Sequence, residues 1–352
     1  MHIPLLRILD RVKGGMICLA LGLLPKRKPV PVRRILCIQL WGLGETTLTL
    51  PALSALKRKY PKAEIDILAT PRNAAIYAQQ PFHTIVRSPL GVLLFGLANC
   101  QRYDLVIDFE EYLRIPAVTA RLAGKYAVGF ATNIRGRCFD KTVSYDGTQH
   151  TAETFLDLVR ALGIRTGPAK LAPLILSSDE KKAADRFMKT HNLPGFIGVA
   201  PFVAESSPQR AWPFFDDLVP KLKHPVVVFG SPDELQKVSW KGVVLAELPL
   251  RQSIALLSKA ELLIANDSGL LHIAAAQGVP TIGIFGPNIP ARWRPLSRGS
   301  APVYKGYWCS PCINSHLGQF PPCRYGKDVR CLRRISAEDV LAQVKNSQHK
   351  VY

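Results

Sequence analysis

The sequence predicts an α/β protein with two parallel-sheet domains, on three observations. Its 352 residues exceed the usual size of one compact domain. From Arg34 onward, short apolar runs alternate with amphipathic stretches, which is the pattern of βα units. The segment 171–178, with Pro173 and few charges, separates two such series. We therefore expect four parts: a basic segment at 1–32, domains at 33–172 and 173–335, and a helix with a tail at 336–352.

Each series predicts five strands, which are short and largely apolar. In the first series these are 35–40, 64–68, 84–86, 105–109 and 127–130. In the second series they are 197–202, 226–229, 243–245, 262–265 and 282–285. Helices are predicted at 46–60, whose carboxyl end is basic as the helix dipole favours, and at 336–344. Two such sheets would face a central cleft at the carboxyl ends of their strands, where open α/β sheets bind ligands.

The N-terminal segment combines an apolar stripe with positive charge. The stripe has helical spacing and consists of Leu5, Ile8, Leu9, Val12, Met16, Leu19 and Leu23. Residues 1–34 hold eight basic side chains and one acid, and the apolar run 16–24 is too short to span a bilayer. These features favour a helix that lies in the plane of a membrane surface. A plain docking helix and a cleaved secretory signal are the alternatives, although Pro25 and three basic residues stand where a cleavage site is expected.

The whole chain is also basic, with 46 Lys and Arg against 26 Asp and Glu and a net charge of +20. Such an excess indicates an anionic partner: nucleic acid, a membrane or a phosphorylated substrate. The sequence shows no zinc-finger, RNP or helix-turn-helix pattern, so we expect no nucleic-acid partner.

The strongest local motif runs from Leu263 to Ala276: an apolar strand, a polar Asn-Asp-Ser-Gly turn and a helix of small residues. A turn of this kind presents free N–H groups at a helix N-terminus, where phosphate binds. Alternatively, Asp267 or Ser268 simply caps the helix.

Three charged side chains follow predicted strands. Arg210 offers a fork of donors that matches a diphosphate, or else is a solvated loop residue. Glu234 could accept hydrogen bonds from ribose hydroxyls, or else is an ordinary acid at a helix start. Glu45 opens a helix after a loop that contains Gly42 and Gly44, with no G-x-G-x-x-G or Walker pattern.

Four of the eight cysteines cluster near the C-terminus: Cys309, Cys312, Cys323 and Cys331. Without an export signal we expect a reducing compartment, where stable disulfides are disfavoured. The cluster then predicts either a structural metal site, zinc or iron, or free thiols packed in a loop.

Together these segments resemble glycosyltransferase family 9, the ADP-heptose:lipopolysaccharide heptosyltransferases, over residues 33–346. The resemblance rests on Asn266–Gly269, His272–Ala276, Gly278-Val279-Pro280 and Phe285-Gly286-Pro287, with Leu50-Pro51 and Tyr60-Pro61 near the start. It also includes His150, Glu153 and Ala161-Leu162-Gly163.

The resemblance implies a GT-B fold and an inverting, metal-independent transfer of heptose from ADP-heptose to a lipopolysaccharide core or a related anionic glycolipid. It implies Glu45 as the base, where the family usually has Asp, and Gly42 and Gly44 in the acceptor loop. If Glu45 is not the base, the next candidates are Glu110 and Glu111, which stand at the end of the fourth predicted strand. The donor would be bound by Arg210 (usually Lys), Glu234, Asp267, Ser268, Gly269 and His272. We expect a cytoplasmic enzyme, peripheral on the inner membrane. A nucleotide-sugar epimerase and a non-catalytic GT-B binding or assembly protein are the rival functions.

Overall fold

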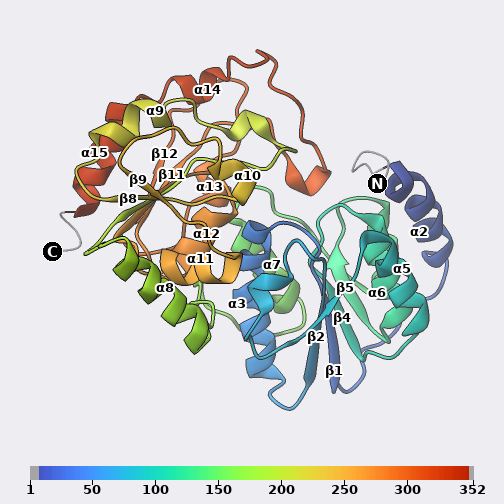
Figure 1. Cartoon of the computed structure of the whole chain (residues 1–352). Helices are drawn as coiled ribbons and strands as arrows, with labels where there is room; N and C mark the ends of the chain where they lie inside the picture. The colour runs from blue at the N-terminus through green and yellow to red at the C-terminus, as the bar shows by residue number, and fades with distance from the viewer. Residues whose placement is uncertain (1–7, 349–352) are drawn as a thin grey trace. The chain divides into compact units, whose positions relative to one another are not determined.

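The computed structural model describes residues 8–348, and the chain divides into two compact units (Figure 1). Unit 1 comprises Met1–Ala169 and Asn314–Gln319, and unit 2 comprises Lys170–Ile313 and Phe320–Tyr352. The basic N-terminal segment is part of unit 1, and the C-terminal helix is part of unit 2. A short stretch late in the sequence therefore belongs to the first unit, which the predicted boundaries did not include.

Unit 1 is built on a six-stranded parallel sheet in the order β3-β2-β1-β4-β5-β6. Its strands are β1 (Arg34–Ile38), β2 (Glu64–Ala69), β3 (His83–Val86), β4 (Leu105–Asp108), β5 (Ala127–Phe130) and β6 (Lys141–Val143). Its helices are η1 (Asp10–Gly14), α2 (Gly15–Leu21), α3 (Leu43–Lys59), α4 (Ala74–Tyr77), α5 (Pro89–Ala98), α6 (Arg114–Ala123), η2 (Ile134–Cys138), α7 (Thr151–Arg160) and η5 (Ser315–Leu317). Helices α3 and α7 cover one face of the sheet, and α2, α5 and α6 cover the other (Figure 1).

Unit 2 repeats this plan with the order β12-β11-β10-β7-β8-β9, which is the same topology when its six strands are counted from β7. Its strands are β7 (Ile197–Ala200), β8 (Val226–Val228), β9 (Val243–Leu245), β10 (Leu262–Asn266), β11 (Thr281–Ile284) and β12 (Ala301–Val303). Its longer helices are α8 (Ser178–Thr190), α11 (Leu250–Leu257), α12 (Gly269–Ala276) and α15 (Ala337–Gln348). Its short helices are η3 (Pro208–Arg210), α9 (Phe215–Leu218), η4 (Val219–Lys221), α10 (Pro232–Leu235), α13 (Pro290–Trp293) and α14 (Arg330–Arg333).

The central strands form because short, largely apolar stretches are buried on both faces, as parallel sheets require. All four residues of β4, β5, β7 and β11 are buried. Strands β6 and β12 were not predicted; they are three-residue edge strands with a lysine or a proline and partly exposed side chains. These two strands can be recognised only from their pairing with β5 and β11, since neither has the continuous apolar run by which the other strands were predicted.

The N-terminal helical segment, η1 and α2, packs on α6 through its less apolar side. Asp10 is buried and accepts hydrogen bonds from the N–H groups of Arg114 and Ile115 at 2.8–3.1 Å, so it caps the start of α6. Cys18 is fully buried in the same contact. The opposite side exposes five large apolar residues, which we call the N-terminal stripe: Ile8, Val12, Met16, Leu19 and Leu23, at 45–83% exposure.

Two of the eight N-terminal basic residues are structural in this arrangement. Arg27 pairs with the buried Asp140 at 2.9 Å, and Lys26 donates to the carbonyl groups of Arg137 and Phe139. These two residues therefore hold the segment to unit 1, and their charges are used within the protein instead of facing an anionic surface. Leu5 and Arg7 lie outside the described residues. Over residues 8–348, every helix is too short or too polar to cross a membrane.

Candidate functional site

Both sheets have a topological switch point, where the chain leaves two neighbouring strands toward opposite faces. In unit 1 these strands are β1 and β4, and in unit 2 they are β7 and β10. Ligands of open α/β sheets bind at the carboxyl ends of such strand pairs. The predicted site residues fall largely into these two places, and each place is described separately below.

In unit 1, the loop after β1 places the Glu45 side chain beside Gly42. Gly42 has an extended backbone at the N-cap position of α3, and Glu45 lies in the first turn of that helix, half-buried. A Cβ atom on Gly42 would lie 3.3 Å from the Glu45 Oε2 atom. Gly42 therefore leaves room for the Glu45 carboxylate beside the loop backbone, and Gly44 is buried within the helix.

The loop after β4 adds a second carboxyl group, from Glu110. Its Oε1 atom accepts a hydrogen bond from the Leu40 N–H group at 2.6 Å, which ties this loop to the loop after β1. Its Oε2 atom is buried and lacks a hydrogen-bond partner among residues 8–348. Burial, followed by the negative charge of Asp108, raises the pKa of Glu110 well above its usual value. Burial of Glu110 therefore favours its neutral form over the carboxylate.

A buried ion pair supports the loop after β4. Asp108 and Arg135 are both completely buried, and their side chains meet at 2.5 Å. Asp108 also accepts from the Glu110 N–H group, and Arg135 donates to the carbonyl groups of Leu113 and Phe130. Burial outweighs the arginine and raises the pKa of Asp108 to about 6. The pair thus fixes the backbone that presents Glu110 and Glu111.

Glu111 lies in a separate aromatic environment on the same loop. The Tyr145 hydroxyl donates to Glu111 Oε1 at 2.5 Å, and the His316 ring stacks on Tyr145 with centroids 4.6 Å apart. Gly318 contacts the ring of Tyr112, where a Cβ atom would approach to 2.7 Å. The stretch Asn314–Gln319 therefore completes this side of unit 1.

In unit 2, Asn266 joins the ends of β7 and β10. It is fully buried, accepts from the Trp212 N–H group at 3.1 Å, and donates to the Pro201 carbonyl group at 2.6 Å. These two bonds fix the loop that carries Arg210. The Arg210 Nη1 atom donates to the Asp267 carbonyl group at 3.1 Å and lies 3.7 Å from the Asp267 carboxylate. The structure thus brings Arg210 to the Asn-Asp-Ser-Gly turn, 57 residues away in sequence.

Asp267 is buried between two partners, so its role is to orient them. Its Oδ2 atom accepts a short 2.5 Å hydrogen bond from Asn288, in addition to the contact with Arg210. Burial raises the pKa of Asp267, and the Arg210 charge and the Asn288 hydrogen bond oppose that shift. The carboxylate holds the guanidinium of Arg210 in place while the Arg210 side chain keeps 21% of its surface exposed.

The start of α12 lacks a side-chain cap within the described chain. Ser268 occupies the N-cap position, but neither Ser268 nor Asp267 bonds the N–H groups of the first turn. The Ser268 hydroxyl is buried, and the part of the chain that the structure describes offers it no hydrogen-bond partner. The capping alternative is therefore wrong, and the N–H groups at Gly269 remain suited to an anion. His272 follows one turn later, buried, with its ring 6.0 Å from the Trp293 ring.

Glu234 has a structural role at the start of α10. Its Oε2 atom accepts from the Ser231 N–H group at 2.8 Å and from the Ser231 hydroxyl at 2.9 Å, which forms a capping box. The helix-start alternative is thus confirmed. The residue is only half-buried. Ribose binding by Glu234 stays a prediction.

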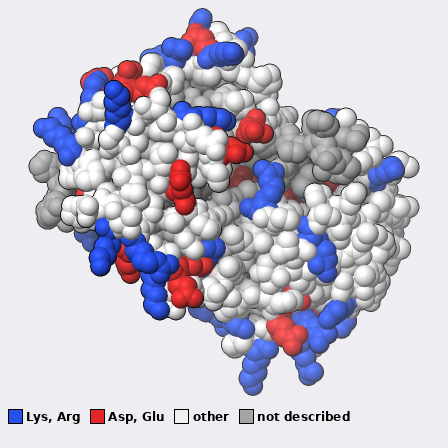
Figure 2. Space-filling view, in the orientation of Figure 1, with Lys and Arg blue, Asp and Glu red and all other residues white. Residues whose placement is uncertain are grey.

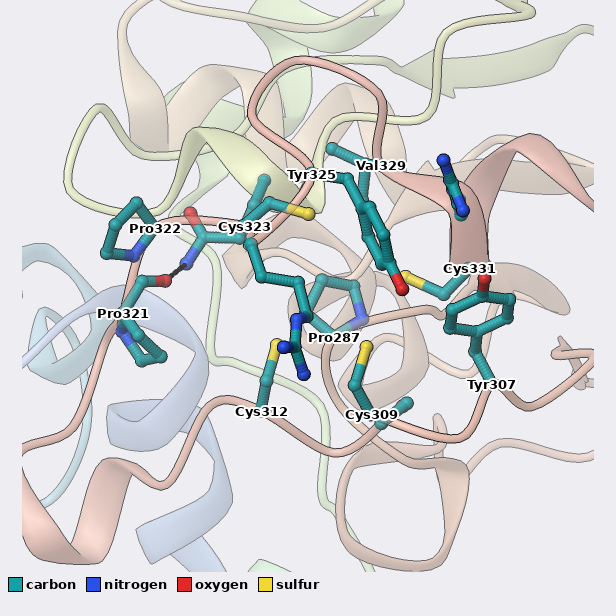
Figure 3. A pocket seen from close by; sticks show the side chains of 14 residues that line it. Pro287, Tyr307, Cys309, Cys312, Pro321, Pro322, Cys323, Tyr325, Val329 and Cys331 are labelled. Atoms are coloured by element: carbon teal, nitrogen blue, oxygen red, sulfur yellow. Dashed lines mark hydrogen bonds between the residues drawn. The ribbon is translucent and has the colours of Figure 1, made fainter.

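The four late cysteines line one pocket in unit 2. The pocket has a volume of about 280 Å³, and its walls also include Pro287, Tyr307 and Tyr325 (Figure 3). The sulfur atoms of Cys309, Cys312, Cys323 and Cys331 surround the same space. In residues 8–348 no three such side chains are already arranged to hold a metal ion. Burial raises the pKa of Cys331 to about 11.

Some residues of these places were missed by sequence reasoning. Asn288 follows β11 and binds Asp267, and its position just after a predicted strand was the available signal. Arg135 gave no such signal, because it pairs with Asp108 across 27 residues and lies in the short helix η2, which was not predicted.

Comparison with known proteins agrees with this geometry. Residues 97–318 match the model of glycosyltransferase family 9 (heptosyltransferase). A curated relative is lipopolysaccharide heptosyltransferase 2 of Salmonella typhimurium, 24% identical over 75% of this chain and 86% of the relative. Among solved structures, ADP-heptose lipopolysaccharide heptosyltransferase II of Escherichia coli has a TM-score of 0.68 at 20% identity, covering 90% of this chain and 99% of the other.

A further similar structure is TibC from enterotoxigenic Escherichia coli, described as a dodecameric iron-containing heptosyltransferase in complex with ADP-D-β-D-heptose. Its TM-score is 0.57 at 15% identity, and the match covers 93% of this chain and 78% of the other. These likenesses confirm the predicted GT-B fold of two parallel sheets with flanking helices. The family match covers more than half of the sequence, and the chain therefore belongs to glycosyltransferase family 9, the heptosyltransferase family.

Proposed function

We propose that this glycosyltransferase transfers heptose from ADP-heptose to the core of lipopolysaccharide or a related anionic glycolipid. The observation that carries the proposal is the turn of unit 2, where Arg210 meets the uncapped start of α12. A guanidinium and converging N–H groups suit a diphosphate, which is the leaving group of a nucleotide sugar. The names of the relatives support heptose and ADP as the specific donor.

The proposed step is an inverting displacement that needs no catalytic metal. The acceptor hydroxyl loses its proton to the Glu45 carboxylate, and its oxygen forms a bond to the anomeric carbon. The bond from that carbon to the diphosphate oxygen breaks on the opposite face, and ADP leaves. Arg210 and the N–H groups at Gly269 stabilise the charge that develops on the diphosphate. Asp267 and Asn288 hold Arg210 and the turn in position.

The direct test is ADP release from ADP-heptose in the presence of a lipopolysaccharide acceptor that lacks heptose. Glu45→Gln keeps the size of the side chain and removes its basicity, so we expect transfer to fall by about 100- to 10,000-fold. Glu45→Asp is the matched control, because it keeps a carboxylate and has the family's more usual residue. Calorimetry should show unchanged ADP affinity in both variants. Wild-type transfer by Glu45→Gln would move the base to Glu110 or Glu111.

We also propose that the four late cysteines bind one structural metal ion, zinc or iron. The support is that four thiols from three stretches of chain surround one pocket, a donor set that suits either metal. Cys309, Cys312, Cys323 and Cys331 would supply the ligands and so brace the loop from Tyr307 to Arg330.

Metal analysis of the purified protein tests this site. We expect about one equivalent of metal, lost in a Cys309→Ser/Cys312→Ser variant and retained in Cys100→Ser, whose cysteine is exposed and remote in sequence. Iron would give thiolate charge-transfer absorption in the visible range, whereas zinc would be colourless. Less than about a tenth of an equivalent of either metal would leave these cysteines as packed thiols.

The third part of the proposal places the protein in the cytoplasm, peripheral on the inner membrane. The N-terminal stripe supports this placement, because its apolar side chains point away from α6. Deleting the segment would be a poor test, since it would also remove Asp10 from the start of α6. Val12→Gln/Met16→Gln/Leu19→Gln changes exposed positions only. We expect it to float less with anionic vesicles than the wild type, and equal flotation would refute the anchor.

A further inference from the structure

Helix α5 exposes a second apolar surface, which the N-terminal segment does not account for. Leu90, Leu94 and Leu97 are 61%, 65% and 56% exposed, and their spacing of four and three residues places them on one side of the helix. The ten residues of α5 include no charged side chain. A surface helix normally carries polar residues on its outer side, so three aligned leucines indicate a contact with an apolar partner. We call these three residues the α5 face.

The packing of α5 keeps the leucines outward. Its inner side, Val92, Phe95 and Gly96, is buried against α6. The Thr119 hydroxyl donates to the Val92 carbonyl group at 3.1 Å, and a Cβ atom on Gly96 would lie 3.0 Å from the Thr119 Cα atom. Because the two helices are in such close contact, α5 cannot rotate its leucines into the core without separating from α6.

The N-terminal segment also packs on α6. A Cβ atom on Gly14 would lie 3.0 Å from the Arg114 Cβ atom, and Asp10 caps α6. Helices α2, α5 and α6 lie on one side of the first sheet (Figure 1). The surface at the right of this view, where α5 lies, is mostly without charged side chains (Figure 2). The α5 face and the N-terminal stripe are thus both outward surfaces of this one helical layer.

The charges at the ends of these helices are positive. Arg87 and Arg102 flank α5, both exposed, and the sequence from 86 to 102 contains no acid. Arg11 and Lys13 are exposed beside the stripe. Asp10, the one acid within residues 1–34, is buried against α6. At the far end of α5, Glu64 and Asp66 line a pocket together with Phe95 and Arg102, away from the three leucines. An apolar surface edged by cations is complementary to an anionic bilayer, with its acyl region below and its phosphates at the rim.

We propose that the α5 face and the N-terminal stripe form one two-helix docking surface for an anionic lipid bilayer. The inference rests on the proposed membrane location and assigns α5 as the second contact. Leucines 90, 94 and 97 enter the interfacial region, and Arg87 and Arg102 lie at the level of the lipid phosphates. Two helices fixed to α6 give the protein a defined orientation on the membrane, which a single helix free to roll would not provide.

The test is flotation of the full-length protein with vesicles of phosphatidylglycerol and phosphatidylcholine. Leu90→Gln/Leu94→Gln/Leu97→Gln should lower the partition coefficient by about tenfold or more, because three apolar side chains lose their transfer from water. The matched control is Ile175→Gln/Leu317→Gln, at exposed positions elsewhere (48% and 49%), which should bind as the wild type does. Wild-type binding should also fall on pure phosphatidylcholine.

Three outcomes would overturn the inference. The first is wild-type flotation of the α5 variant, provided that its circular dichroism and melting match the wild type. The second is flotation in which the α5 variant and the control lose binding equally. The third is a wild-type dimer in analytical ultracentrifugation that the α5 substitutions dissociate, since a second copy would then cover the leucines. Transfer to a water-soluble acceptor fragment is a separate measurement: its absence in the wild type would refute the proposed function and leave the flotation result valid.

Discussion

The switch points of the two sheets have the same topology and opposite chemistry. In unit 1, the end of β4 ties the loop after β1 through a carboxyl group, Glu110 to the Leu40 N–H group. In unit 2, the end of β10 ties the loop after β7 through an amide, Asn266 to the Trp212 N–H group. Each tie places the first strand's loop beside the fourth strand's loop. The same scaffold therefore fixes two loops in each unit, and the choice of side chains decides which charge they present.

That choice produces an acidic place and a cationic place. Unit 1 gathers Glu45, Glu110 and Glu111 at the carboxyl ends of β1 and β4, and the buried Arg135 beside them is paired with Asp108. Unit 2 presents Arg210 and an uncapped helix start. Proton acceptance needs the first arrangement, and binding of a diphosphate needs the second. The repeated fold thus allows the two tasks to be divided between the units.

The largest effect is expected from breaking the buried ion pair of Asp108 and Arg135, which supports the loop after β4 in unit 1. Arg135→Met would leave Asp108 buried without its cation, so we expect a loss of about 3–5 kcal/mol in the free energy of unfolding. Denaturant titration measures this loss, with the exposed Arg186→Met as control. Adding Asp108→Leu should recover much of it, since no uncompensated charge remains. A change below about 1 kcal/mol in Arg135→Met would show that the pair does not support this loop.

The cationic character of unit 2 is tested by Arg210→Ala. The variant removes charge-assisted hydrogen bonds to the diphosphate, each worth about 1.5–3 kcal/mol, so ADP should bind roughly 10- to 150-fold more weakly in calorimetry. Arg210→Lys keeps the positive charge but loses the two-pronged guanidinium. Its ADP affinity should therefore lie between those of the wild type and Arg210→Ala. Unchanged ADP affinity in Arg210→Ala would place the diphosphate elsewhere.

The smallest effect is expected from Glu110→Gln, which replaces the carboxyl acceptor in unit 1 with an amide, the type of group that Asn266 provides in unit 2. The pKa of Glu110 is raised in the folded state, so its stabilising contribution is complete below its ordinary value near 4.3 and is lost as the pH rises toward the folded pKa. Glu110→Gln stays neutral and keeps the acceptor for the Leu40 N–H group. The free energy of unfolding of the variant should therefore decrease less steeply with rising pH than that of the wild type. The two slopes should differ by about 1 kcal/mol per pH unit.

Unfolding at a series of pH values from 4.5 to 8 checks this expectation. Asp108, whose pKa is raised to about 6, should leave a residual decline up to that pH in the variant. Identical pH slopes for Glu110→Gln and the wild type would mean that Glu110 is ionised in the folded protein.

The sequence predicted what depends on local pattern. The ten apolar runs correspond to β1–β5 and β7–β11, because burial on both faces demands continuous apolar residues. The Asn-Asp-Ser-Gly turn could also be found from consecutive residues, because it is a polar interruption between an apolar strand and an apolar helix. The edge strands β6 and β12 were missed because pairing with a neighbour defines them.

Long-range contacts account for the other differences. The pair of Asp108 with Arg135, the hydrogen bond from Asn288 to Asp267, and the bond of Glu110 to Leu40 each depend on folding that brings distant segments together. The apolar spacing of the N-terminal segment could be seen in the sequence. It did not show which side of the segment faces α6, because the charged Asp10 lies on the packed side.

The contact of Asp10 with the start of α6 has a consequence for biosynthesis. Asp10 and Arg114 are 104 residues apart. At a translation rate of roughly 5–20 residues per second, about 5–20 s pass between their emergence from the ribosome. During that interval the helix around Asp10 lacks its partner on α6, and both of its sides are open. We therefore expect the nascent chain to be bound first by a chaperone or by lipid, so that contact with the membrane precedes completion of the enzyme.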